Sequence, residues 1–387
     1  MEKRLENNSF TKLYFGTWNR KSPFFQSTQK YGAKAYDIYC HMYLPIYYDD
    51  PIKEYWALVN DVTLWDVSVE RIVEITGPDA SEFTNYLTCR DLTKCAVGQG
   101  KYMLVTAPDG GIVNDPVLMR IGENQWWMAL ANNDAGLYAL GAAVNSKFNV
   151  KVTEPEVYPL QVQGPKSIKV MQTLFGDKIL QVKYYWTLET DLDGIPVVIS
   201  RTGWTGEMGY EIYLRNATLY AEDMWNAVLK AGKKHKLMVI APAHHRRIQA
   251  GILSWGQDMD HEHNPFQCNL GYQVSLSGKN QWEKQADYIG RDALEKMKEQ
   301  LKNGEKPYKL QLVGFELGGK PIEEYAPDFW LISNTSSSKP VGYITSPWYH
   351  PEKKQNIAMG YVPYEGNLNN KGFPIGNFGK KYKVHLP

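Results

Sequence analysis

The stretch from Ser200 to Tyr213 constrains this chain more than any other part of the sequence. An apolar run at 195–199 leads into it, and 210–214 at its end has the composition of a second strand. Three glycines at three-residue spacing interrupt the chain between these runs: Gly203, Gly206 and Gly209. Glycine permits either a tight turn or a close approach of the backbone to a flat ligand. The stretch therefore predicts two strands joined by a glycine-rich connection.

The second of these strands carries a carboxylate and a phenol on one face. Side chains alternate along a strand, so Glu211 and Tyr213 share one face while Tyr210 and Ile212 share the other. A carboxylate at a strand end can accept two hydrogen bonds from a planar heterocycle with adjacent N–H donors, such as a pterin ring. The alternative is a structural hairpin whose acidic residue binds no ligand.

Length and charge argue against several classes of protein. The 387 residues are too many for one small core and predict two or three domains. The net charge is +1 and no basic stripe is evident, so nucleic acid is not an expected partner. No apolar run approaches the ~20 residues of a membrane span, and the polar start 1–4 is unlike a secretory signal. The four cysteines lack metal-type spacing and predict free thiols in a reducing cytoplasm.

Two pairs of histidines raise the question of a metal site. His261 and His263 flank Glu262, and His244 adjoins His245. Two imidazoles without further ligands are fewer than a metal needs, so we expect no metal and favour a loop or ligand-pocket role for both pairs. No G-x-G-x-x-G motif follows a strand-like run, which argues against a dinucleotide-binding domain.

The chain divides into three parts. Residues 1–30 are polar and predict an irregular N-terminal arm. Residues 31–300 mix strand-like and helix-like runs without regular alternation, which indicates two α+β subdomains. The charged stretch 293–309 begins as a helix and ends as a linker. Residues 308–387 contain short strand-like runs separated by Gly, Pro and Asn, which predicts a small all-β domain.

Motifs in a single order along residues 30–387 give the chain a family resemblance. The segment 200–211 resembles the S-R-T-G-[YF]-T-G-E-x-G-[FY]-E signature of the glycine-cleavage T-protein family of folate enzymes. Other segments resemble further motifs of that family: 64–68, 75–80, 87–92, 110–115, 160–166, 247–251, 288–294, 341–346 and 356–363. Their shared order makes the resemblance specific.

The resemblance implies a fold and a cofactor. The family fold is an α+β ring of three domains around a folate site, with two ferredoxin-like domains and a C-terminal antiparallel β-barrel. The implied cofactor is tetrahydrofolate, which accepts a one-carbon unit near Asp115, the match to the family's reactive carboxylate. A carboxylate there can hydrogen-bond a ring N–H and align the folate nitrogen with the donor. An Asn-Asp-Pro turn is the structural alternative for this residue.

The resemblance also assigns residues to the folate site. Glu211 matches the acceptor at the pterin edge, with Tyr213 and Trp204 as packing or stacking partners. Tyr102 and Arg247 match a tyrosine and an arginine near the ligand. Each of three residues has a structural alternative, which is core packing for Trp204 and Tyr102 and a salt bridge on a helix surface for Arg247.

Departures from the aminomethyltransferase pattern point to one branch of the family. Asn114 replaces the first acid of an Asp-Asp pair, and 243–249 departs from the usual A-R-D-S-L-R-L-E. Segments 64–71 and 253–259 look more like the tetrahydrofolate-dependent dimethylsulfoniopropionate demethylases. The segment 205–207 argues against this branch, because its residues match the aminomethyltransferase motif. We therefore expect a methyltransferase that demethylates a small sulfonium or related onium donor and passes the methyl group to folate N5.

An onium donor suits the residues of the N-terminal segment. A sulfonium methyl is already activated because its leaving group departs neutral, so the protein need only align it and exclude water. Aromatic faces stabilise such a cation by ~0.5–2 kcal/mol each. Seven tyrosines either line the donor pocket or pack the arm onto the rest of the protein: Tyr31, Tyr36, Tyr39, Tyr43, Tyr47, Tyr48 and Tyr55.

Three other functions stay open. An aminomethyltransferase of glycine cleavage would take its one-carbon unit from a lipoyl carrier protein and yield 5,10-methylenetetrahydrofolate. A folate module of dimethylglycine or sarcosine oxidation would need a flavin domain, which is not evident here. A non-enzymatic folate-binding protein is expected to carry K-G-C-[YF]-x-G-Q, which this sequence lacks. The expected partner is a small methylated molecule, and self-association as a homo-oligomer is left open.

Overall fold

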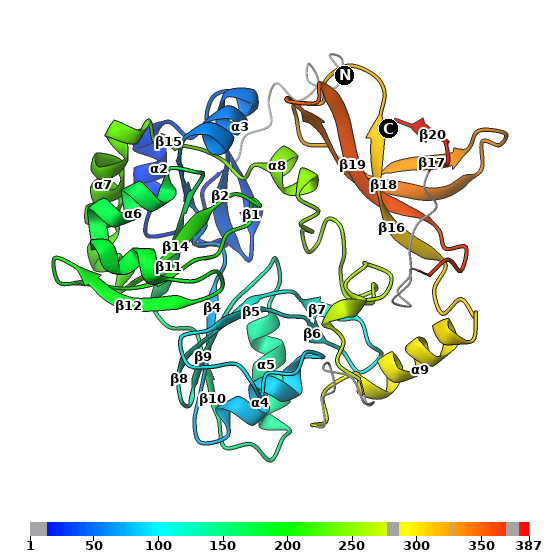
Figure 1. Ribbon diagram of the computed structural model, residues 1–387, viewed down its shortest axis with the longest axis horizontal. Coiled ribbons are helices and arrows are strands. Elements are labelled where there is room, and N and C mark those ends of the chain that lie inside the picture. The colour runs from blue at the N-terminus through cyan, green and yellow to red at the C-terminus, as the bar shows by residue number, and fades with distance from the viewer. Residues whose placement is uncertain (1–13, 277–285, 327, 369–378, 387) are drawn as a thin grey trace.

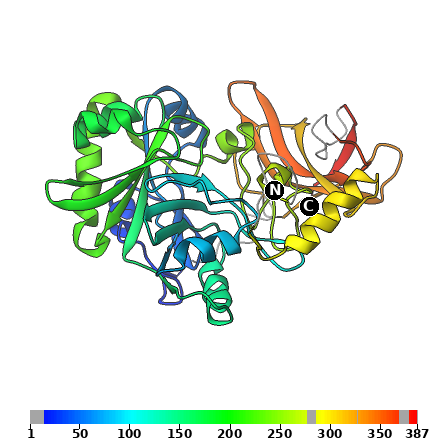
Figure 2. The ribbon, with the colours of Figure 1, turned by 60° about the horizontal axis from the view of Figure 1, so that its bottom comes forward.

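The computed structural model describes residues 14–276, 286–326, 328–368 and 379–386. Its elements form three groups around the centre of the molecule, two of mixed helix and strand and one dominated by strands (Figure 1). After a 60° turn, the C-terminal strands still lie on one side of the two mixed groups (Figure 2). Within the described residues, no helix is long and apolar enough to cross a membrane. The arrangement confirms the α+β class.

The first mixed group is a ferredoxin-like sheet with two helices. Its elements are β4 (Ile72–Thr76), α4 (Ala80–Leu87), β5 (Gly100–Tyr102), β8 (Val117–Gly122), β9 (Gln125–Ala129), α5 (Ala135–Val144) and β10 (Lys151–Thr153). The strands lie in the order β10-β4-β9-β8-β5, and every neighbouring pair is antiparallel. Without the edge strand β5, this is the order of a β-α-β-β-α-β unit. A separate ladder of β6 (Val105–Thr106) and β7 (Ile112–Asn114) leads to Asp115.

The second mixed group repeats this plan with one inserted strand. Its elements are β3 (Thr63–Asp66), β11 (Val157–Gln163), α6 (Ser167–Phe175), η1 (Asp177–Gln181), β12 (Thr187–Leu192), β13 (Ile195–Ser200), β14 (Gly209–Arg215), α7 (Ala217–Gly232), η2 (Lys233–His235) and β15 (Met238–Val239). The order is β12-β13-β14-β11-β3-β15, so β3 lies between β11 and β15. Strands β13 and β14 pair antiparallel, which confirms the two strands predicted around the glycine-rich connection.

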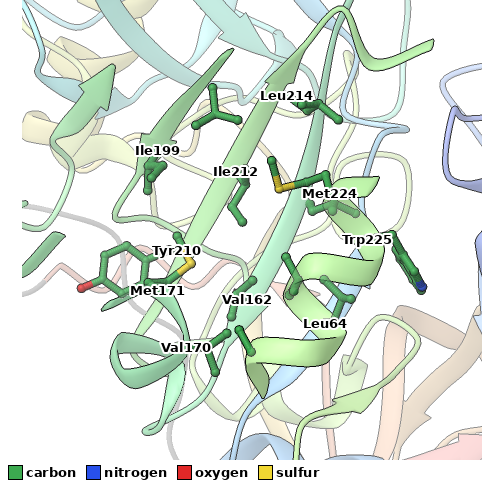
Figure 3. Packing of buried hydrophobic residues seen from close by; sticks show 14 of the residues in the cluster. Leu64, Val162, Val170, Met171, Ile199, Tyr210, Ile212, Leu214, Met224 and Trp225 are labelled. Carbon is green, nitrogen blue, oxygen red and sulfur yellow. The ribbon is translucent and has the colours of Figure 1, made fainter. Parts of the chain in front are cut away.

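The main core sits between this second sheet and the helices α6 and α7. Tyr210 and Ile212 of β14 point into it beside Val162 of β11 (Figure 3). Burying a large apolar side chain contributes about 1.5–3 kcal/mol relative to leaving it exposed. This packing sends Glu211 and Tyr213 to the opposite face of the sheet, as the alternation along the strand predicted.

The N-terminal segment is more ordered than its polar composition suggested. Its elements are α2 (Phe25–Tyr31), β1 (Ala35–Tyr39), β2 (Met42–Tyr47) and α3 (Pro51–Asn60). Residues 1–13 of the expected arm lie outside the described residues, but the rest is not irregular, because α2 forms and Phe24 is fully buried in the main core. The average composition concealed these apolar contacts. The β1–β2 hairpin turns at Cys40 and His41, whose positive φ values suit a two-residue hairpin loop.

The described part of the C-terminal third begins with helices and continues with strands. Its elements are α8 (His244–Gln249), η3 (Gly271–Gln273), α9 (Arg291–Lys302), β16 (Leu310–Leu317), β17 (Trp330–Asn334), β18 (Pro340–His350), β19 (Gln355–Pro363) and β20 (Tyr382–His385). The strands form an antiparallel sheet in the order β16-β19-β18-β17-β20, with no pairing between β16 and β20 in the described residues. One core cluster contains both Leu301 and Tyr308. Packing therefore continues across the predicted boundary at 300 and 308, which stays a prediction.

Candidate active site

The glycine-rich connection is folded around one buried side chain. Gly203 and Gly209 leave room for the amide of Gln163, which a Cβ at either position would overlap. The Gln163 Nε2 donates to the Thr202 carbonyl at 3.0 Å, and the Thr205 hydroxyl donates to Gln163 Oε1 at 3.0 Å. Two of the three glycines thus allow a close contact within the protein.

Glu211 lies in the second sheet, opposite Gln161 of β11 and Ser200 of β13. The Gln161 Nε2 donates to Glu211 Oε1 at 2.7 Å, while the hydroxyls of Thr202 and Tyr213 donate to Oε2. Burial raises the pKa of Glu211, and these donors counteract part of that shift. Because the donors come from the sheet and the start of the glycine-rich connection, the carboxylate is held in one orientation.

Asp115 follows β7, where Asn114 anchors the neighbouring loop. The Asn114 amide donates to the Ala131 carbonyl at 3.2 Å and to Asn133 Oδ1 at 2.8 Å, and it accepts from the Ala131 N–H at 3.1 Å. An ionised aspartate could not donate, which explains the departure from an Asp-Asp pair. The Tyr102 hydroxyl donates to Asp115 Oδ2 at 3.0 Å, and Asp115 Oδ1 has no partner in the described chain. Burial raises the pKa of Asp115 to about 7.

A third carboxyl group, that of Glu70, lies within electrostatic range of the other two. Burial raises the pKa of Glu70 well above its ordinary value, and the charges of Glu211 and Asp115 raise it further. Glu70 sits in the turn after β3, where its N–H donates to the Val67 carbonyl at 2.9 Å. Glu70 belongs to the segment 64–71 that resembles the demethylases, but the resemblance assigned no role to this residue.

Further phenols surround the carboxyl groups. The pKa of Tyr102 is raised mainly by burial and Asp115, and also by Tyr272 and Tyr185. The pKa of Tyr185 is raised mainly by burial, with contributions from Glu211 and Tyr272. The structure thus brings the predicted pair of Glu211 and Tyr213 into one electrostatic neighbourhood with Asp115 and Tyr102, which were predicted separately. Tyr185 and Tyr272 belong to it as well, although their sequence context gave no signal.

A pocket of about 300 Å³ opens beside these groups, where the N-terminal hairpin, the second sheet and the segments after α8 meet. Its polar lining includes the carboxylates of Asp37 and Glu70 and the amide of Gln161. No lysine or arginine belongs to the described residues that line it. Aromatic rings make up much of the wall: Tyr39, Trp65, Trp204, Trp255 and Tyr325. An aromatic wall with carboxyl groups, and with no basic residue among its described lining, suits a small cation.

Trp204 and Arg247 are in contact, but only Trp204 belongs to the described lining of the pocket. Trp204 lines the pocket, and its Nε1 donates to the Leu253 carbonyl at 3.1 Å. Arg247 of α8 is fully buried, with its guanidinium carbon 5.2 Å from the Trp204 ring centre. The guanidinium pairs with Asp258 and donates to Ser346 Oγ of β18 at 2.8 Å. Arg247 is absent from the described pocket lining, and it joins Trp204 to the C-terminal sheet.

The histidine pairs make contacts within the protein. His263 Nδ1 lies 2.8 Å from Asp260 Oδ1, and its Nε2 lies 3.2 Å from the Tyr343 hydroxyl. His244 lines the pocket, where burial lowers its pKa well below the ordinary value and keeps the ring neutral. Among the described residues, no group of three or more His, Cys, Asp or Glu side chains is placed to hold a metal ion.

The seven tyrosines between 31 and 55 divide between the two roles left open by the sequence. Tyr39 lines the pocket. Tyr36 and Tyr43 pack around Phe25, and Tyr48 belongs to the main core. Three of the seven rings therefore pack within the N-terminal segment and the main core, while Tyr39 at the tip of the hairpin contributes one ring to the pocket.

Two family models match this chain. The GCVT N-terminal domain matches residues 24–278, and the glycine cleavage T-protein C-terminal barrel domain matches residues 311–386. These matches follow the same order as the motifs of the sequence and span both mixed groups and the C-terminal sheet.

Curated proteins and a solved structure resemble the chain over most of its length. The dimethylsulfoniopropionate demethylase DmdA of Ruegeria pomeroyi is 33% identical over 345 residues, which cover 89% of each chain. An aminomethyltransferase of Caldanaerobacter subterraneus subsp. tengcongensis is 28% identical over 372 residues, 92% of this chain and 90% of the relative. The glycine cleavage system aminomethyltransferase T from Bartonella henselae has a similar fold, with a TM-score of 0.76 at 24% identity over 89% of this chain and 90% of that one. The chain therefore belongs to the glycine-cleavage T-protein family of tetrahydrofolate-dependent methyl and aminomethyl transferases.

Proposed function

We propose that this enzyme demethylates a small methylated onium compound, such as dimethylsulfoniopropionate, and passes the methyl group to tetrahydrofolate N5. The pocket carries the proposal, because tyrosine and tryptophan rings and two carboxylates line it without a lysine or arginine in its described wall. Each ring that faces a bound cation contributes ~0.5–2 kcal/mol. The 33% identity to the demethylase DmdA supports the same class of substrate.

The acidic groups beside the pocket fit the edge of a pterin ring. A pterin presents adjacent N–H donors, and the buried acceptors Gln161 Oε1 and Asp115 Oδ1 of this neighbourhood lack partners among the described residues. We assign Glu211, together with Gln161, to the pterin edge, and Tyr213 to holding the Glu211 carboxylate. Tyr102 holds Asp115 in the same way.

Asp115 is the residue that we place at the reacting end of folate. Bound tetrahydrofolate supplies a nucleophilic nitrogen as the methyl acceptor. Asp115, with a pKa of about 7, can hold or release a proton at the ring near neutral pH. Trp204 covers one wall of the pocket and excludes water from the donor. Arg247 acts through Trp204, because its own donors are taken by Asp258 and by other groups of the chain.

The second candidate is the aminomethyltransferase reaction of glycine cleavage. Curated aminomethyltransferases are 27–29% identical over 89–95% of this chain, which favours this reaction on similar grounds. Its donor is carried on a lipoyl carrier protein, so activity would depend on that partner. Its product would be 5,10-methylenetetrahydrofolate in place of 5-methyltetrahydrofolate.

A product assay tests the proposal directly. Purified protein is incubated with tetrahydrofolate and dimethylsulfoniopropionate, and the products are identified by mass spectrometry. We expect 5-methyltetrahydrofolate and methylmercaptopropionate in equal amounts. Absence of methylfolate with every sulfonium, betaine and methoxy donor would overturn the proposal. Formation of methylenefolate only with an aminomethyl-loaded lipoyl carrier would favour the second candidate.

We also propose that the protein is located in the cytoplasm and that the demethylase reaction needs no protein partner. A further proposal is that the chain divides into two parts near 300–308. The four cysteines are buried and form no disulfide bond, which agrees with a reducing compartment. Glu305 lies in the exposed segment 303–306, so cleavage there by a glutamate-specific protease should produce two fragments. The shared core of Leu301 and Tyr308 should keep these fragments together in gel filtration. The same column measures whether the intact chain forms a homo-oligomer.

A further inference from the structure

The pocket contains one carboxylate that nothing in the described chain neutralises. Glu70 lines the pocket, and within the described residues its carboxylate has no hydrogen-bond or ion-pair partner. The neighbouring Arg71 is engaged elsewhere, since its guanidinium contacts Asp134 at 2.8 Å and Glu154 at 2.6 Å. The residues that surround Glu70 electrostatically are the carboxyl groups of Glu211 and Asp115, which repel it. A carboxylate in this setting lacks a positive charge.

A second acceptor faces the same space. Gln161 is fully buried and lines the pocket, and its Oε1 has no partner among the described residues. The other carboxylate of the wall, Asp37, is exposed and already accepts from the Ile38 N–H at 2.7 Å. The inner part of the pocket therefore offers unsatisfied acceptors, while its outer carboxylate is solvated. A bound ligand can supply the partner that such a group lacks.

We infer that Glu70 is the counter-ion of the donor's onium group and sets the pocket's preference for positively charged donors. This inference rests on the proposed function and deepens it. The rings of Trp65 and Trp204 surround the cation without forming a bond to it. A bound cation favours the ionised form of Glu70, because it offsets the burial and the repulsion by Glu211 and Asp115 that raise the pKa of this carboxyl group. The resulting charge pair discriminates a cation from a neutral molecule of the same shape. Glu70 lies near Glu211 and Asp115, which we assign to folate binding. A cation held by Glu70 would therefore present its methyl group toward the folate.

A pair of isosteres tests the inference without turnover. Choline and 3,3-dimethylbutan-1-ol have the same shape, and only choline carries the positive charge. Titration calorimetry of the folate-free full chain should give tighter binding of choline by about ten-fold or more. In Glu70→Gln, which keeps the size of the side chain, this preference should fall by about the same factor. Glu70→Asp keeps the charge and should retain most of the preference, which separates loss of charge from loss of folding.

Two further variants complete the design. Glu222→Gln removes a charge from the surface pair with Lys30 and should leave the preference unchanged. Asp37→Asn removes the outer carboxylate and should have the smaller effect of the two pocket variants. The inference is overturned if Glu70→Gln keeps the wild-type preference, if Asp37→Asn abolishes it instead, or if wild-type protein binds the two isosteres equally.

The outcomes also separate this inference from the proposed function. Methylfolate production by the wild type, together with an unchanged preference in Glu70→Gln, would reject the role of Glu70 alone. Loss of the preference in Glu70→Gln, with no methylfolate from any onium donor, would reject the demethylase reaction and retain Glu70 as a cation-binding group.

Discussion

Gln161 and Glu211 face each other across the neighbouring strands β11 and β14, with the Gln161 Nε2 donating to Glu211 Oε1 at 2.7 Å. The other carboxylate oxygen accepts from Thr202 and Tyr213. The acceptor is therefore oriented before any ligand arrives, which reduces the entropy lost on binding. Because the unpartnered Gln161 Oε1 lies beside it, the pair offers an edge with spare acceptors.

Replacing Glu211 by alanine should weaken tetrahydrofolate binding. The pterin would lose a charge-assisted pair worth on the order of 1.5–3 kcal/mol, which corresponds to roughly 10- to 150-fold in affinity. Titration calorimetry with tetrahydrofolate measures this change. Tyr213→Phe is the matched control, because it removes one internal donor and leaves the carboxylate in place. Equal folate affinity in wild type and Glu211→Ala would mean that Glu211 serves the fold alone.

Replacing Asp115 by asparagine should reduce turnover more than folate affinity. General acid–base groups contribute about 10²–10⁴-fold in rate, so we expect kcat to fall by at least about 10²-fold. In the wild type, a step that needs the carboxylate should speed up as pH rises through about 7, where Asp115 ionises. The pH–rate profile of Asp115→Asn should lose this limb. A pure loss of folate binding at constant kcat would contradict the role.

Asp115 should also make the folded protein less stable at high pH. Its folded pKa of about 7 exceeds its ordinary value of 3.8, so between these values the folded state binds the proton and the unfolded state releases it. The free energy of unfolding therefore falls as pH rises across this window. Asp115→Asn should melt at a higher temperature than wild type at pH 8, with the difference shrinking toward pH 4. Identical melting differences at both pH values would reject the raised pKa.

The ion pair of Arg247 and Asp258 should be essential to stability, because both side chains are fully buried. Removing one partner leaves an uncompensated buried charge, so Arg247→Ala should lower the free energy of unfolding by about 3–5 kcal/mol. Urea denaturation measures the loss. The exposed pair of Lys30 and Glu222 provides the comparison, and Lys30→Ala should change stability by less than about 1 kcal/mol. Similar losses of unfolding free energy in Arg247→Ala and Lys30→Ala would show that the buried pair stabilises the fold no more than the exposed pair does.

A methyl group at Gly209 should displace the buried Gln163 amide. Overpacking of this kind costs about 1–3 kcal/mol, so Gly209→Ala should be destabilised by that amount. In a Gln163→Ala background the added Cβ has room, and a double-mutant cycle should give a clear coupling energy. Gly141→Ala in α5, where a Cβ meets nothing within 4 Å, should be neutral or stabilising by up to about 1 kcal/mol. Additive effects in the cycle would show that Gln163 is not the obstacle.

Local patterns predicted much of the fold around the site. Strands β13 and β14 lie within one residue of their expected runs. The face that carries Glu211 and Tyr213 was also correct, because strand alternation is a property of adjacent residues. The N-terminal arm was predicted poorly because Phe24 finds its partners in a distant core, which average composition does not reveal.

The candidate site was predicted in part, for a related reason. Asp115 and Glu211 stood out through family motifs, and they do approach one electrostatic neighbourhood through Glu70. The segment 64–71 contains Glu70 but gave no sign of its role, since its importance comes from the absence of a partner among the described residues. Arg247 matched a motif, but its burial against Asp258 could not be read from the motif alone.

The sequence by itself determined the strand and helix periods, the glycine-rich connection and the family. These follow from sterics and side-chain alternation over a few residues, and from motifs kept in one order. The tertiary structure alone decided which side chains meet, because the decisive contacts join distant residues. Gln161 and Glu211 are 50 positions apart, and Arg247 and Ser346 are 99 positions apart. Whether a carboxylate becomes a binding group depends on which residues surround it after folding. The residues around Glu70 are aromatic and acidic.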